Sequence, residues 1–299
     1  MKRLVVLASF AGMVLVVSGC GDAATEAASG MTAETQLNDL FERIDGGLQE
    51  NQAAQLLARR HQQEAVQECM AQRDQKYVLD ILDAPVWSED TFRVGHGGTD
   101  WLQPLYGDLN IADSARQGAR GDADLQDKSY LNELSAEDRA AYDSALDRCA
   151  SAGDSAFVLF PEGHESLRAS LVEVLIPYDK EAGERASEYA DCMAGKGFDV
   201  ESPVELFELV SAGFAKVNRA DANYTQGSEF AAAETAEKQA AAADSMCRKD
   251  IYYGALASAA SDVQEWAHSH ERALEELDAQ WAEWIKTAQA QPEAGRVLG

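Results

Sequence analysis

The sequence is poor in proline, in basic residues and in long apolar runs, and each shortage excludes a class of protein. Only 6 of the 299 residues are proline and 22 are glycine, which together with abundant Ala, Glu and Gln favours helices over a many-stranded sandwich. The 25 Lys and Arg residues are outnumbered by 52 Asp and Glu, so the formal net charge is −27. A surface this acidic repels phosphate backbones, and we therefore expect no nucleic-acid partner.

Several catalytic and metal-binding patterns are also missing. There is no Gly-x-Ser-x-Gly and no Ser followed three residues later by Lys, so nothing indicates serine-acylase chemistry. There is no Cys-x-x-Cys, and His164-Glu165 lacks the second His of a zinc-protease helix. On a helix His268 and His270 would lie about 200° apart, too far round to share one metal ion. We predict no cofactor, no catalytic residue and no metal site from these patterns.

The N-terminus has the pattern of an export signal. Lys2 and Arg3 precede an apolar stretch from Leu4 to Val17, and small residues follow up to Cys20. At about 14 residues this stretch is shorter than the roughly 20 that a membrane-spanning helix needs, and no later segment approaches that length. We therefore predict a signal peptide over residues 1–19.

The small residues that end in Cys20 resemble the lipobox of bacterial lipoproteins. In that family the Cys becomes the first residue after cleavage and carries a diacylglyceryl thioether. The resemblance implies a lipid anchor on the extracytoplasmic face of the cell membrane, and an ordinary signal peptide that happens to contain a Cys is the alternative. Residues 20–34 are small and polar, so we expect them to form a flexible acylated linker.

Four cysteines remain besides Cys20, an even number in an exported chain, where disulfides persist. The sequence Cys69-Met70-Ala71 recurs as Cys192-Met193-Ala194, each with a basic residue four positions after the Cys, which suggests two related halves. In each half an Ala-rich helical run carries a second cysteine, Cys149 or Cys247. Of the three possible pairings we therefore favour Cys69 with Cys149 and Cys192 with Cys247.

Apolar spacing predicts helices along most of the chain. One helix is expected from near Thr35 toward Met70, with a possible break at Gly46-Gly47. Pro177 predicts a kink or a boundary in a later helix. Lys196-Gly197 predicts the end of another helix. Ser135 and Ser202 each predict the start of one.

The last long helical stretch, from Ser228 to about Gln289, contains no proline and a single glycine. We expect two helices here, joined near Tyr253-Gly254. Trp266, Trp281 and Trp284 belong to a set of large side chains that recur at close to 3.6 residues, which predicts a face buried in the core. A surface for a partner helix or for sugar stacking is the alternative.

These features predict an all-α fold of two related helical halves, each closed by a disulfide. Half A spans residues 35–150 and half B residues 165–290, with a connector at 151–164 and a flexible tail at 291–299. Within half A, the stretch from Trp87 to Leu134 is a long irregular segment rich in Gly and Asp.

Four short motifs resemble those of a known group of proteins. They are Cys192-Met193-Ala194-x-Lys196-Gly197-Phe198, Trp101–Asp108, Tyr130-Leu131-x-x-Leu134-Ser135-x-x-Asp138 and Asp244-x-x-Cys247-Arg248-Lys249. On these motifs most of the mature chain resembles uncharacterised actinobacterial secreted and lipid-anchored proteins. The first half departs from the pattern, because Asp74 stands where Gly is usual. The resemblance implies an all-helical, disulfide-linked envelope lipoprotein without assigned chemistry.

One acidic loop has the spacing of a calcium site. Asp122, Asp124, Gln126 and Glu133 stand at positions 1, 3, 5 and 12 of an EF-hand loop. Asp127, however, occupies the sixth position, where Gly makes the turn. We therefore interpret the segment as a solvated acidic loop and keep calcium binding as the alternative.

Two functions remain open. The first is a non-catalytic module, lipid-anchored through Cys20, that presents a helical surface or groove to another envelope protein or to a small solute. The second is an envelope hydrolase, which would bury two carboxyl groups together beside an open groove. Because no catalytic motif is present, we favour the first.

Overall fold

The computed structural model describes residues 21–79, 92, 95–105, 109–121, 129–151, 159–219, 223–292 and 294–297. Within these ranges the regular secondary structure is entirely helical, which confirms the predicted all-α class. The elements are α1 (Gly21–Asp45), α2 (Leu48–Ala71), α3 (Ile111–Gly121), η1 (Ser129–Glu133), α4 (Ala136–Cys149), α5 (His164–Gly183), α6 (Ala186–Gly195), α7 (Pro203–Phe214), η3 (Tyr224–Gln226), α8 (Ser228–Gln289) and α9 (Ala294–Val297).

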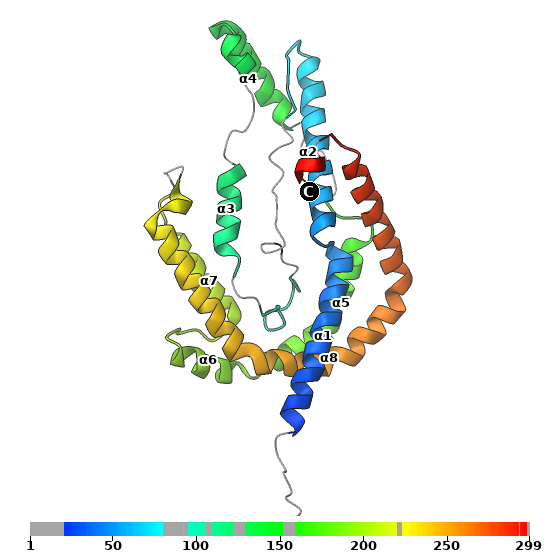
Figure 1. Cartoon of the computed structure of the whole chain (residues 1–299), viewed down its shortest axis with the longest axis vertical. Coiled ribbons are helices and arrows are strands. Elements are labelled where there is room, and N and C mark those ends of the chain that lie inside the picture. Colours follow the sequence, from blue (N-terminus) through cyan, green and yellow to red (C-terminus); the bar gives the residue numbers. More distant parts are fainter. Residues whose placement is uncertain are drawn as a thin grey trace, which may run out of the picture.

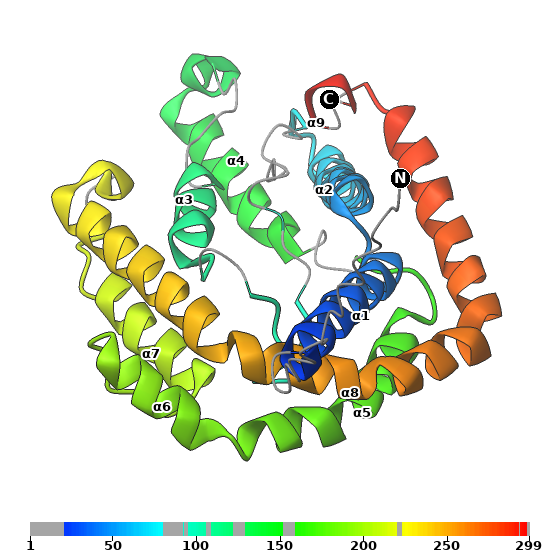
Figure 2. The same ribbon diagram turned by 60° about the horizontal axis from the view of Figure 1, so that its bottom comes forward.

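Helix α8 is the central element on which the other helices pack, and it contacts α1, α2, α3, α5, α6, α7 and α9. It curves as one continuous arc with α5, α6 and α7 along its outer side (Figure 2). The prediction of two helices was wrong, because α8 is a single helix of 62 residues that runs through Gly254. Buried neighbours of Gly254, among them Tyr252 and Leu256, pack against the core on either side of it. This packing outweighs the roughly 1 kcal/mol that a glycine costs inside a helix.

Helix α1 crosses α8 at close range (Figure 1). Gly30 sits against the backbone of Tyr253, where a Cβ atom would collide with the Tyr253 carbonyl oxygen. Glu34 accepts hydrogen bonds from the hydroxyls of Tyr252 at 3.0 Å and Tyr253 at 3.2 Å. The expected flexible linker at 20–34 is therefore wrong for residues 21–34, which belong to α1.

A predicted break separates α1 from α2. Gly46 has a φ of +78°, a conformation that favours glycine, and it stands between the two helices. The side-chain amide of Asn51 donates to the carbonyls of Asp45 and Gly46 at 3.0 and 2.9 Å, which satisfies two carbonyl groups at the end of α1.

Two predicted helix starts are confirmed, whereas the boundary considered at Pro177 is absent. Ser135 and Ser202 accept hydrogen bonds from the backbone amides three residues later, as N-cap residues do. Helix α5 instead continues through Pro177, so this proline is not a boundary.

Both disulfides form as predicted. Cys69 and Cys149 join α2 to α4, and Cys192 and Cys247 join α6 to α8, each with a Cα–Cα distance of 5.6 Å. The two bonds close loops in the two predicted halves.

The recurring Cys-Met-Ala sequence ends both of its helices with the same turn. The amide of Gln75 donates to the Met70 carbonyl at 3.1 Å, and the amide of Phe198 donates to the Met193 carbonyl at 3.0 Å. These bonds enclose a left-handed residue, which is Asp74 with φ +56° after α2 and Gly197 with φ +91° after α6. Asp tolerates this conformation better than most side chains, so the departure from Gly leaves the turn intact.

The two halves share one core. Leu37, Phe41 and Ile44 of α1 belong to the same buried cluster as Leu171 of α5 and the α8 residues Trp266 and Trp281. The predicted apolar face of the Trp-rich stretch is therefore confirmed as core. Half A adds a smaller cluster of its own, around Met70 and Tyr142, between α2 and α4.

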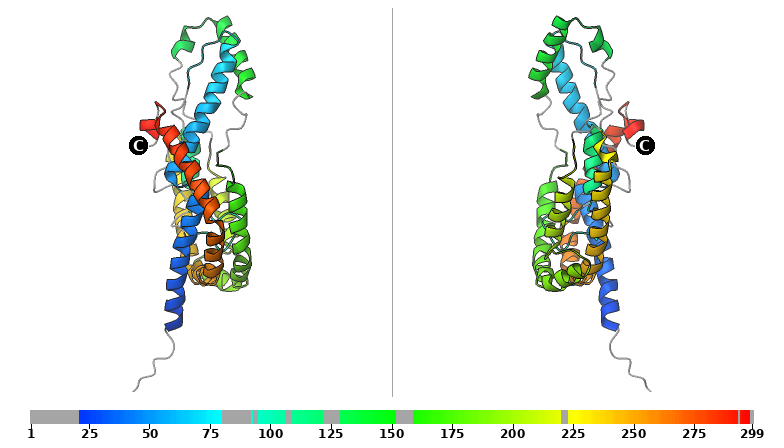
Figure 3. Two further views of the ribbon diagram at one scale, coloured as in Figure 1. Left: turned by 90° about the vertical axis from the view of Figure 1, so that its right-hand side faces the viewer. Right: turned by 90° about the vertical axis from the view of Figure 1, so that its left-hand side faces the viewer.

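The molecule is elongated. The N-terminal end of α1 projects at one end, and the paired α2 and α4 form the opposite end (Figure 3). None of the helices in the described ranges has the length and hydropathy of a membrane span.

Candidate ligand-binding cavity

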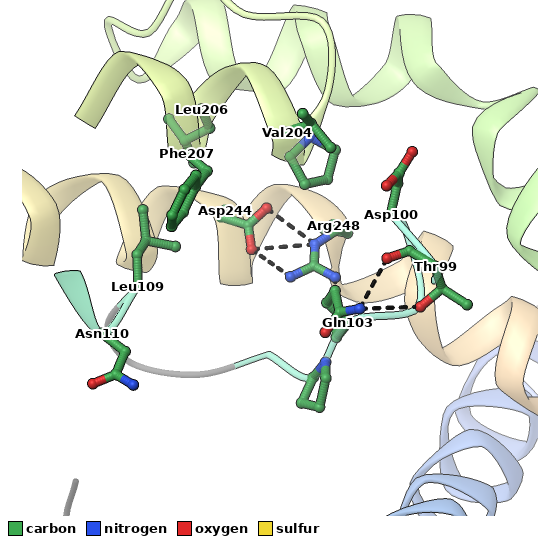
Figure 4. A pocket seen from close by; sticks show the side chains of 12 residues that line it. Thr99, Asp100, Gln103, Leu109, Asn110, Val204, Leu206, Phe207, Asp244 and Arg248 are labelled. Atoms are coloured by element: carbon green, nitrogen blue, oxygen red, sulfur yellow. Dashed lines mark hydrogen bonds and ion pairs between the residues drawn. The ribbon is translucent and has the colours of Figure 1, made fainter. Parts of the chain in front are cut away.

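A cavity of about 330 Å³ lies between α7, α8 and the irregular segment that leads into α3 (Figure 4). Its volume is at the lower end of the range found for small-molecule sites. It is lined by Thr99, Asp100, Gln103, Pro104, Leu109, Asn110, Pro203, Val204, Leu206, Phe207, Asp244 and Arg248.

One wall is a folded loop, residues 95–105, inside the stretch expected to be irregular. Its central side chain is His96, which is fully buried and stacks on Phe41 of α1 with ring centroids 4.7 Å apart. The His96 Nδ1 atom lies 2.7 Å from the Leu102 carbonyl oxygen, and Nε2 lies 2.8 Å from Asn38 Oδ1. The loop turns at Gly97–Gly98, where the Thr99 amide donates to the His96 carbonyl at 3.3 Å.

Burial lowers the pKa of His96 to about 4, and the positive charge of Arg168 adds to the effect. The ring is therefore neutral at physiological pH. Since Nδ1 must then donate to the Leu102 carbonyl, Nε2 accepts, and the Asn38 amide supplies the donor by turning its NH₂ group toward the ring.

The same loop is fixed to α5 by a carboxylate. Asp179 Oδ1 accepts hydrogen bonds from the backbone amides of Asp100, Trp101 and Leu102, at 3.1, 2.8 and 3.0 Å. Three successive amides converging on one oxygen hold the chain in a tight turn. The turn carries Trp101 and Leu102 into the core, where both are buried.

The floor of the cavity is an ion pair on α8. Arg248 Nη2 lies 2.6 Å from Asp244 Oδ2, and their side chains are only 4% and 6% exposed. Arg248 Nη1 also donates to the carbonyls of Trp101 at 2.9 Å and Gln103 at 2.6 Å. Tyr189 of α6 donates to Asp244 Oδ1 at 3.1 Å. The pair thus joins α8, α6 and the loop wall at one point.

The opposite wall is apolar and comes from α7. Leu206 is buried beneath it, whereas Val204 and Phe207 are 43% and 48% exposed. Large apolar side chains at this exposure beside a cavity are typical of a ligand site. Figure 4 shows Phe207 and Leu109 on the same side of the Asp244–Arg248 pair.

Helix α3 is positioned by a buried acid of α8. Glu237, 1% exposed, accepts hydrogen bonds from the first backbone amides of α3, Ile111 at 2.7 Å and Ala112 at 3.0 Å. Asn110, which precedes them, has a φ of +60°. This arrangement holds Leu109 and Asn110 at the mouth of the cavity.

The predicted site residues lie elsewhere or outside the described ranges. Cys20 and the calcium candidates Asp122, Asp124 and Gln126 are not among the described residues, and Glu133 is an exposed residue at the end of η1. In the part of the chain that the structure describes, no group of three or more His, Cys, Asp or Glu side chains could hold a metal ion.

The sequence analysis did not predict that the residues of the cavity floor form a site. Asp244-x-x-Cys247-Arg248 carried a resemblance, and no site was predicted from it. The usable signal is the spacing of four between Asp244 and Arg248, which places both on one face of a helix. Taken alone, this spacing predicts an ordinary ion pair on the helix surface and not a buried pair in a cavity.

Comparisons of the chain with protein families, with curated proteins and with solved structures found no match.

Proposed function

We propose that this protein is a non-catalytic extracytoplasmic module that binds a small solute in the cavity between α7, α8 and the loop at 95–105. The observation that carries the proposal is the combination, in one half-open cavity, of exposed apolar side chains and a buried, fixed guanidinium. A pocket with mostly apolar walls and a few positioned polar groups is the usual form of a small-molecule site.

We further propose that the module is anchored to the cell membrane by a lipid on Cys20, as in the actinobacterial lipoproteins that it resembles. The leader and the small residues before Cys20 support this. Two acyl chains would hold the protein stably, whereas one gives only marginal binding. Since α1 begins at Gly21, the anchor would join the folded body through the projecting N-terminal end of this helix rather than through a flexible stalk.

The geometry gives less support to the alternative of an envelope hydrolase. Two carboxylates are buried among the described residues, Glu237 and Asp244. Glu237 accepts from two backbone amides of α3, and Asp244 accepts from Arg248 and Tyr189. Each of these carboxylates is thus held by donors of the fold itself, Glu237 at the start of α3 and Asp244 between α6 and α8.

Phe207→Ser should weaken probe binding in the cavity. The test uses the full chain carrying Cys20→Ser, so that neither acyl chains nor detergent compete for the probe. Binding of Prodan, a neutral fluorescent naphthalene ketone, is followed by the blue shift of its emission. Because Phe207 forms part of the apolar wall, we expect its loss to weaken Prodan binding about fivefold or more.

Leu209→Ser is the matched control. Leu209 lies on the same helix, is 50% exposed and does not line the cavity, so Prodan affinity should stay within about twofold. Equal losses in the two variants would mean that Prodan binds a general apolar surface of α7, and the proposal would fail.

A further inference from the structure

We propose that the natural ligand of this cavity is an uncharged molecule with an apolar body and a hydrogen-bond acceptor at one end, such as an amide, ketone or ester. This inference rests on the proposed function and names the chemical class of the solute. Three features of the lining support it, namely its charge, a spare hydrogen-bond donor on Arg248 and the position of its apolar wall.

The charge of the lining disfavours an anion. Arg248 is the cavity's positive group, and the carboxylate of Asp244 neutralises it at 2.6 Å. Asp100 adds a further negative charge at the exposed edge. A carboxylate or phosphate entering the cavity would lose its hydration without gaining an uncompensated cation.

The hydrogen bonds of Arg248 leave one donor. A guanidinium has five N–H groups. Nε and one Nη2–H bind Asp244, and the two Nη1–H groups bind the carbonyls of Trp101 and Gln103. Within the described ranges, no acceptor takes the second Nη2–H. Figure 4 shows the guanidinium between Asp244 and Gln103.

The nearby polar side chains of the loop are already engaged with one another. The side-chain amide of Gln103 donates through Nε2 to the Thr99 carbonyl at 2.8 Å. Its Oε1 accepts from the backbone N–H of His96 at 3.2 Å. The Thr99 hydroxyl donates to the His96 carbonyl at 2.8 Å. Among Thr99, Gln103 and Arg248, the donor left for a ligand is the spare N–H of Arg248, which calls for an acceptor.

The rest of the lining requires an apolar ligand body. Leu109, Val204 and Phe207 face the same space and offer no hydrogen bonds from their side chains. Covering their exposed surface removes apolar area from water, which contributes roughly 25 cal/mol for each Å². A ligand with its acceptor at Arg248 would place its hydrocarbon part along these residues.

The test compares three molecules that share an eight-carbon chain and differ in the charge of the head group. Octanamide is neutral and accepts hydrogen bonds, octanoate is an anion, and octylammonium is a cation without an acceptor. Each is titrated against Prodan bound to the full chain carrying Cys20→Ser, and the midpoint of displacement is measured at low and at physiological salt.

We expect octanamide to displace Prodan at a concentration about tenfold lower than either charged molecule, and this order should disappear in Phe207→Ser. Tighter binding of octanoate would overturn the inference in favour of an anion site, and tighter binding of octylammonium would overturn it in favour of a cation site. A different order of head groups, with Prodan binding still dependent on Phe207, would contradict only the inferred class of ligand. Prodan binding that does not depend on Phe207 would contradict the proposed function itself.

Discussion

Replacing Arg248 by methionine is expected to lower the free energy of unfolding by about 3–5 kcal/mol. Arg248 and Asp244 are both almost completely buried, so the substitution leaves a carboxylate inside the protein without its counter-charge. The carbonyls of Trp101 and Gln103 lose their donor at the same time. Urea unfolding followed by circular dichroism measures the change.

Arg272→Met is the matched control. Arg272 lies on the same helix and pairs with Glu276 four residues later at 3.0 Å, but its side chain is 90% exposed. Exposed pairs of this type contribute about 0.5 kcal/mol or less, so this variant should be nearly as stable as the parent. If Arg248→Met costs no more than Arg272→Met, the buried pair does not join the elements around the cavity.

Between pH 7 and pH 5 the protein should lose about 2 kcal/mol of stability because of His96 alone. Its pKa is about 4 in the folded protein, against an ordinary value of 6.5. Between these values the unfolded chain binds a proton that the folded protein does not bind, so the free energy of unfolding falls as the pH is lowered. Well above pH 6.5 the ring is neutral in both states and this loss is absent.

His96→Gln removes the titrating ring while keeping an amide that hydrogen-bonds. Urea unfolding at pH 7, 6 and 5 should show a clearly shallower decline for this variant than for the parent. The comparison stops at pH 5 because carboxylates begin to titrate below it. Parallel declines would show that His96 takes up its proton without opposing the fold.

Local sequence signals predicted the parts of the fold that depend on nearest neighbours. The caps at Ser135 and Ser202, the break at Gly46 and the turn after Met193 each follow from a few adjacent residues. The disulfide pairing was also predictable, because the Cys-Met-Ala repeat divides the four cysteines into two pairs.

The secondary-structure predictions were wrong where contacts between residues far apart in the sequence determine the structure. Residues 21–34 have the composition of a linker, yet Gly30 allows α1 to approach the backbone of Tyr253 on α8. Helix α3 contains two glycines and was assigned to an irregular segment, yet it is capped by Glu237, 126 residues further along the chain. No local pattern contains such contacts.

The cavity was beyond prediction for the same reason. Asp244 and Arg248 form a helical pair of the spacing usually found on surfaces. The pair is buried because Tyr189 of α6 and the carbonyls of Trp101 and Gln103 surround it. Only the assembled fold brings these three segments together.

Mass spectrometry of the N-terminal peptide, from protein purified out of its native membranes, tests the proposed lipid anchor on Cys20. We predict a mature chain that begins at Cys20, lacks residues 1–19 and carries a diacylglyceryl thioether on that cysteine. A native chain that still begins with Met1, or one with an unmodified Cys20, would contradict a membrane-anchored extracytoplasmic binding module.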